Sequence, residues 1–63
     1  MDIGGKIMFY RRVRNMSQTE LAAKLGMSVP QLCRYERGRQ QPKIPVLERI
    51  AKGLDVSISE LLF

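Results

Sequence analysis

Four basic side chains lie close together in the middle of the chain: Arg34, Arg37, Arg39 and Lys43. Guanidinium groups bind phosphates or guanine edges through paired hydrogen bonds, and an ammonium group binds phosphate as a point charge. Residues 1–43 carry a net charge of +6, and residues 44–63 a net charge of −1. A merely solvated surface would not need such clustering, so this pattern indicates anion binding, with nucleic acid as the first anion to consider.

The composition argues against several other functions. The chain has 63 residues, one cysteine and no histidine, so it forms one domain without an internal disulfide or a Cys/His zinc site. Acid–base catalysis at neutral pH would need a strongly shifted carboxylate or lysine, for which a chain this small has little room. We therefore expect no enzyme, metal or cofactor. No apolar stretch approaches the ~20 residues of a membrane span, and a single cysteine agrees with a reducing cytoplasm.

Helices are expected to position the basic cluster. Ser-x-x-Glu/Gln segments at residues 17–20, 28–31 and 57–60 predict three helix starts, since the serine hydroxyl can cap the third amide and the Glu or Gln can accept from the serine amide. Apolar spacing predicts two more helices. Its members are Ile3, Ile7 and Tyr10 in the first, and Leu47, Ile50, Ala51 and Leu54 in the second. The predicted fold is all-α, with five short helices.

Residues 18–37 have the pattern of a helix-turn-helix. Ala22 is small enough for a second helix to cross closely, Gly26 suits a turn with positive φ, and Leu32 would pack the second helix on the first. Only a short segment separates the two helices, so we expect them to cross steeply.

The segment SQTELAAKLGMSVPQLCRYERGRQQP resembles the most diagnostic stretch of the lambda-repressor and Cro group, also called the xenobiotic-response-element family. The segment IAKGLDVSISELL resembles the family's usual ending. The resemblance covers residues 3–62 and implies a compact five-helix domain that binds duplex DNA sequence-specifically. It also implies a bacterial or phage transcriptional regulator, usually a repressor, with a recognition helix at about 29–37 in the major groove.

The resemblance assigns roles to individual residues. Gln18 matches a glutamine that bonds phosphate and can brace a recognition-helix side chain, and Arg11 matches an arginine that pairs with the glutamate of the YERG segment, here Glu36. The other positions assigned to DNA are Ser28, Val29, Pro30, Gln31 and Arg34 in the recognition helix, and Arg37, Arg39, Gln40 and Lys43 after it.

The chain departs from the family where Val29 and Pro30 replace residues that are often polar. Neither can read a base edge by side-chain hydrogen bonds, although Val29 could contact a thymine methyl. Polar readout then falls on Gln31 and Arg34, with the alternative that Gln31 is only an arm of its capping box. Lys43 stands where the fourth helix usually has a serine cap.

Four other residues are not assigned to DNA binding. Arg12 and Arg14 are expected to be solvated, Tyr35 to lie in the core and Cys33 to be a half-buried filler.

We expect a two-fold dimer on a palindromic operator, assembling through the acidic C-terminal third and weak in free solution. The expected contacts are Ile58, Leu61, Leu62 and Phe63, with the alternative that Leu61 and Phe63 close the monomer core. Three other functions remain open: an antitoxin or a restriction–modification controller of the same fold, and a helical protein-interaction domain without DNA binding.

Overall fold

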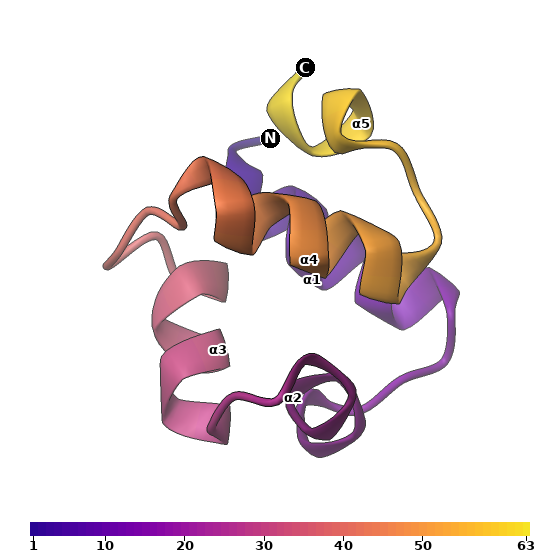
Figure 1. Cartoon of the computed structure of the whole chain (residues 1–63), viewed down its shortest axis with the longest axis vertical. Coiled ribbons are helices and arrows are strands. Elements are labelled where there is room, and N and C mark those ends of the chain that lie inside the picture. Colours follow the sequence, from indigo (N-terminus) through magenta and orange to yellow (C-terminus); the bar gives the residue numbers. More distant parts are fainter.

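The computed structural model describes all 63 residues and contains five helices and no strand, which confirms the predicted fold. The helices are α1 (Ile3–Val13), α2 (Gln18–Leu25), α3 (Val29–Glu36), α4 (Ile44–Leu54) and α5 (Ile58–Leu62). α4 crosses in front of α1, with α2 and α3 on one side of this pair and α5 on the other (Figure 1). None of the helices has the length and apolar character needed to span a lipid bilayer.

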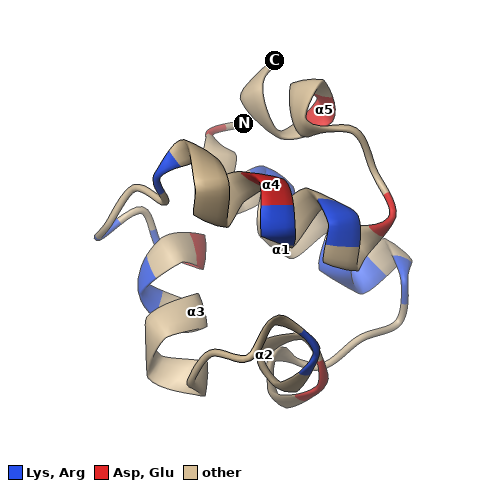
Figure 2. Cartoon of the chain, in the orientation of Figure 1, with Lys and Arg blue, Asp and Glu red and all other residues tan.

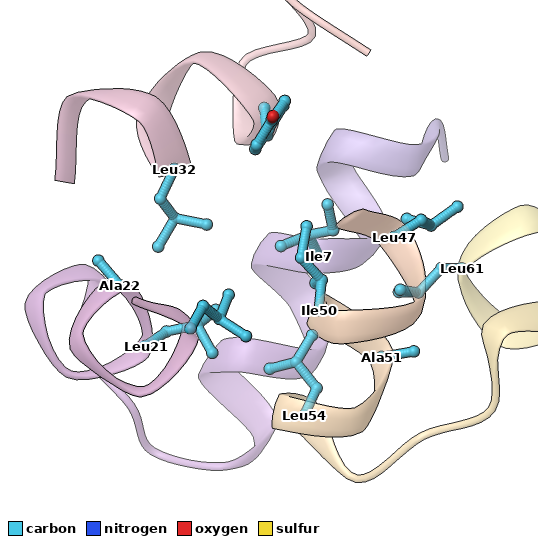
Figure 3. Packing of buried hydrophobic residues seen from close by; sticks show 11 residues of the cluster. Ile7, Leu21, Ala22, Leu32, Leu47, Ile50, Ala51, Leu54 and Leu61 are labelled. Carbon is cyan, nitrogen blue, oxygen red and sulfur yellow. The ribbon is translucent and has the colours of Figure 1, made fainter. Parts of the chain in front are cut away.

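The core consists of aliphatic side chains contributed by all five helices. Its largest fully buried members are Ile7, Leu21, Leu32, Leu47, Ile50, Leu54 and Leu61 (Figure 3). The spacing predicted for the fourth helix is confirmed, since all four of its apolar positions are buried. Tyr35 also lies in the core, as expected, at 7% exposure. Burial of these side chains places α3 with one face inward and the other toward solvent.

The predicted capping box at the start of α2 is complete. The Ser17 hydroxyl accepts from the Glu20 amide at 3.0 Å, and the Glu20 carboxylate accepts from the Ser17 amide at 2.9 Å. Hydrogen bonds from the Ser17 backbone amide and hydroxyl lower the pKa of the exposed Glu20 carboxyl.

The other two predicted capping boxes are not complete. The Ser28 hydroxyl accepts from the Gln31 amide at 3.2 Å, but the Gln31 side chain turns elsewhere. Ser57 makes no capping bond; its hydroxyl lies 3.0 Å from that of Ser59 instead. The prediction of a third box is therefore wrong, because the nearby Ser59 hydroxyl competes for the same side chain.

The turn between α2 and α3 has the predicted geometry. Gly26 has φ +69° and ends α2, and the Met27 amide donates to the Ala22 carbonyl at 3.0 Å. Glycine adopts this left-handed backbone without steric cost. The two helices consequently cross steeply instead of lying side by side (Figure 1).

Two arginines close helix C-termini across the molecule. Arg14 donates to the carbonyls of Leu54 at 2.9 Å and Asp55 at 3.0 Å, at the end of α4. Arg49 donates to the Leu25 carbonyl at the end of α2. The last carbonyls of a helix lack partners within it, and a cation there also interacts favourably with the helix dipole. Arg14 is exposed, as expected, but its guanidinium also has this structural role.

Gly4 allows α1 to pack closely against the end of α3. A Cβ atom at this position would lie 2.4 Å from the Tyr35 carbonyl oxygen and 2.6 Å from that of Glu36. Both obstacles are backbone atoms and cannot swing aside. Gly5 differs, because its Cβ would meet only the side chains of Met1 and Asp2, at 3.0 and 3.1 Å.

We predict that Gly4→Ala lowers the free energy of unfolding by about 1–3 kcal/mol, because the backbone of α3 must move to admit the methyl group. Gly5→Ala is the matched control. Alanine is favoured over glycine within a helix by up to about 1 kcal/mol, and the contacts with the side chains of Met1 and Asp2 offset part of this gain. The free energy of unfolding should therefore change by less than about 1 kcal/mol. Urea denaturation of both variants measures the difference. Equal midpoints for the two variants would contradict the close approach.

Candidate nucleic-acid interface

α3 presents a face of mixed character to solvent. Leu32 and Tyr35 point into the core, and Pro30 and Arg34 are exposed on the other side. Val29 is half-buried and packs partly against the core, so only part of its side chain is available for apolar contact. The exposed face lies at one edge of the molecule (Figure 1).

Gln31 belongs to a chain of side-chain hydrogen bonds rather than to a capping box. Arg34 Nη2 donates to Gln31 Oε1 at 2.6 Å, and Gln31 Nε2 donates to Gln40 Oε1 at 3.2 Å. The alternative that Gln31 only caps its own helix is therefore wrong. The structure brings together three of the residues assigned to DNA, two on α3 and one in the loop that follows it.

The loop after α3 carries the remaining basic side chains. Arg37, Arg39 and Lys43 are all exposed and make no side-chain hydrogen bond or ion pair within the chain. Lys43 is the N-terminal cap residue of α4 but makes no side-chain capping bond. Figure 2 shows basic positions on α3 and along this loop, whereas acidic positions include α5 and the segment before it. The loop can therefore offer several cations to one polyanion.

Glu36 lies among these cations, but its charge is directed inward. Its carboxylate accepts from Arg11 Nε at 2.7 Å and Nη2 at 3.1 Å, and from Gln18 Nε2 at 3.0 Å. Arg11 and Glu36 are only 8% and 4% exposed. Arg11 also donates to the Met16 carbonyl at 2.9 Å. The ion pair expected from the resemblance is thus present, and Gln18 braces α3 through Glu36.

A polar hollow lies between α1, the start of α2 and the end of α3. Its lining includes the predicted residues Gln18 and Arg37 and four residues outside the predicted site: Met8, Arg12, Ser17 and Thr19. Residues 17–19 at the N-terminus of α2 line this hollow, and helix N-termini attract anions. Sequence reasoning missed Arg12 because it lies on α1, where no local pattern separates a solvated arginine from one that faces a shared hollow.

The predicted dimer contacts have different environments. Leu61 is fully buried in the monomer core and cannot contact a partner, so this part of the prediction is wrong. The side chain fits the core because α5 packs against both α1 and α4. Ile58 is half-buried against the core, and Leu62 and Phe63 are 37% and 91% exposed. The alternative that Phe63 closes the core is also wrong.

Comparison with known proteins identifies the family. The helix-turn-helix family model matches residues 7–61. The chain belongs to this family. The resemblance to the lambda-repressor and Cro group of helix-turn-helix proteins is confirmed.

Two curated transcriptional regulators illustrate the similarity. The uncharacterized transcriptional regulator MJ0272 of Methanocaldococcus jannaschii is 34% identical over 89% of this chain and 85% of that protein. The transcriptional regulator SinR of Bacillus subtilis is 41% identical over 95% of this chain, which spans 55% of the length of SinR.

Two solved protein–DNA complexes contain chains with the same fold. A SinR chain in complex with DNA superposes with a TM-score of 0.87 at 40% identity, covering 94% of this chain and 95% of that one. The P22 c2 repressor in complex with a synthetic operator superposes with a TM-score of 0.90 at 26% identity, covering 98% and 94%.

We predict that Glu36→Gln lowers the free energy of unfolding by about 3 kcal/mol, because it leaves the buried Arg11 guanidinium without its counter-charge. A domain of this size is stable by only about 3–9 kcal/mol, so the loss should be plain in urea denaturation. Glu48→Gln is the control, since Glu48 is exposed and outside any ion pair. If both variants unfold at the same urea concentration, the pair contributes nothing to stability.

Proposed function

We propose that this chain binds duplex DNA sequence-specifically as a transcriptional regulator and repressor, with α3 in the major groove. The observation that carries the proposal is the pair of half-buried Gln31 and exposed Arg34, bonded to each other on the outer face of a helix whose other face is buried. An arginine can donate twice to the O6 and N7 atoms of guanine, and a glutamine can pair with adenine. SinR and the P22 c2 repressor, which share the fold, have been solved with DNA, and this agrees with the proposal.

Contacts with the DNA backbone would come from the residues around α3. Arg37, Arg39 and Lys43 are placed to neutralise phosphates, and Ser28 lies at the start of α3. The Gln18 side chain is engaged by Glu36, so its phosphate contact would come from its backbone amide at the α2 N-terminus. Such contacts set register and affinity but carry no sequence information.

The proposed role is DNA binding without catalysis, by a domain that spans residues 3–62. A protein that binds chromosomal DNA would lie in the cytoplasm of a bacterial cell. The alternative of a protein-interaction domain predicts no affinity for random duplex. DNA binding predicts affinity that falls steeply with salt, roughly in proportion to the number of phosphates contacted.

We also propose that two copies bind one palindromic operator. Half-sites lie about 34 Å apart, so each α3 must lie about 17 Å from the two-fold axis. The molecule measures 25 × 23 × 20 Å, and α5 lies on the side away from α3 (Figure 1). A contact through Leu62 and Phe63, with Ile58 beneath them, would give about the required spacing. Because this contact is small, the dimer should be weak in free solution and should assemble on DNA.

We predict that Arg34→Ala removes base discrimination, whereas Lys43→Ala weakens binding to all sequences equally. The first loss should amount to about 1–3 kcal/mol on the cognate duplex alone, because it removes a bidentate base contact. Titration of both variants on cognate and scrambled duplexes, selected first from a random pool, measures the division. Equal losses by both variants on both duplexes would refute it.

We predict two protomers on each operator, with cooperativity lost in Phe63→Ser. This variant removes apolar contact area but leaves the binding of a single half-site unchanged. Val13→Ser is the control, because it also replaces an exposed apolar side chain, at 55% exposure, but on α1 and outside the proposed contact. Stoichiometric titration on full and half operators measures both quantities. Saturation at one protomer per full operator would exclude the dimer.

A further inference from the structure

The hydrogen-bonded chain from Gln40 through Gln31 to Arg34 has a fixed direction. An arginine side chain can only donate, so the Gln31 atom that faces Arg34 must be its oxygen. The Gln31 amide nitrogen is thereby turned toward Gln40, whose own oxygen must accept from it. The observed pairs follow this order, with distances of 2.6 Å and 3.2 Å. Each side chain therefore determines the orientation of the next.

We propose that Gln40 is a positioning residue for sequence recognition, acting on the base contact of Arg34 through Gln31. This inference rests on the proposed function. Gln40 lies in the loop beyond the helix-turn-helix, nine residues from Gln31, and its effect on readout needs no contact with a base. Its oxygen holds the Gln31 amide, and the Gln31 oxygen holds one guanidinium nitrogen of Arg34.

The chain restricts how Arg34 can approach DNA. One of its five N–H groups is directed to Gln31, which leaves the others for a guanine edge. An arginine on an exposed helix face otherwise samples many rotamers, and restricting them before binding lowers the cost of ordering the side chain. Arg34 held by Gln31 should thus favour one base pair over its neighbours.

Docking strengthens the same bonds. Gln31 is half-exposed, and Arg34 and Gln40 are exposed, so water competes with these contacts in the free protein. The major groove excludes part of that water, and an amide oxygen without a donor would be costly there. Arg34 supplies that donor for Gln31, and Gln31 supplies one for Gln40. Breaking the chain at Gln40 removes one of the two bonds that hold the Gln31 side chain, so Gln31 samples more rotamers and holds Arg34 less firmly.

The test compares three variants on duplexes that differ at single base pairs. Arg34→Ala first assigns the base pair that Arg34 reads, in an operator selected from a random pool. Gln40→Leu should then reduce the preference at that base pair about threefold to tenfold, the usual effect of one lost hydrogen bond. Its affinity for scrambled duplex should fall less than its affinity for the cognate duplex. Gln31→Leu should reduce the preference at this base pair by a similar factor. The double variant with Gln40→Leu should reduce it no further, because both residues act in one chain of hydrogen bonds.

Two further variants serve as controls. Gln40→Glu keeps an acceptor for the Gln31 amide, so it should retain the base preference while its added negative charge weakens binding to every duplex. Gln41→Leu changes the neighbouring exposed glutamine, which makes no side-chain hydrogen bond, and should bind as the unmodified protein does. Thermal melting confirms that each variant is folded.

Three results would overturn the inference. Gln40→Leu could bind as the unmodified protein does, it could weaken all duplexes equally, which indicates a phosphate contact, or it could lose preference at a base pair that Arg34→Ala leaves intact, which indicates direct reading. Failure of the proposed function looks different, because the unmodified protein would then prefer no duplex at all.

Discussion

The buried pair between Arg11 and Glu36 is the constraint on which the position of the recognition helix depends. It joins α1 to the end of α3, and Gln18 adds α2 to the same carboxylate. A buried ion pair loses much of its attraction to desolvation, so its main contribution here is geometric. Two parallel bonds from a planar guanidinium fix direction as well as distance, and no aliphatic contact would do so. The arrangement also keeps a carboxylate at the DNA-facing edge from repelling phosphate, since its charge is compensated from within.

Arginine side chains that bond within the fold also help to explain how so small a core can stabilise the domain. Burial on folding rises with chain length, and a domain of this size has little aliphatic surface to spare. Arg14 and Arg49 supply partners for helix-end carbonyls that a larger protein would bury under more structure. The arginines of the chain therefore divide into two groups. One group bonds backbone carbonyls or Glu36 inside the fold. The other lies exposed around α3: Arg37 and Arg39 have no internal partner, and Arg34 bonds only the Gln31 side chain, so this group leaves positive charge available for DNA.

Sequence reasoning succeeded where the determining interactions are local. The five helices, the capping box at Ser17 and the turn at Gly26 depend on residues within a few positions of one another, so their types and spacing carry the information. It failed for contacts that the fold creates: Arg14 bonds a carbonyl 40 residues away, and Gly4 is required by the backbone of α3. Leu61 and Phe63 are both apolar and two residues apart, yet only the packing of α5 decides which is buried. The Arg11–Glu36 pair was found from family resemblance alone, because no spacing rule links residues 25 apart.

The recognition helix itself is divided into a rigid half and an adjustable half. Its first turn is held by the Ser28 hydroxyl, by Pro30 with its restricted φ, and by Val29 packed partly on the core. That turn presents shape and apolar surface, which suit a thymine methyl but do not distinguish donors from acceptors. Hydrogen-bonding choice is left to Gln31 and Arg34, whose long side chains are mobile unless something orients them. The other polar residues of this eight-residue helix, Tyr35 and Glu36, are buried and cannot share this task. Ordering these few side chains before they reach the bases lowers the entropic cost of specific readout, and the loop after α3 lies close enough to order them through the bond between Gln40 and Gln31.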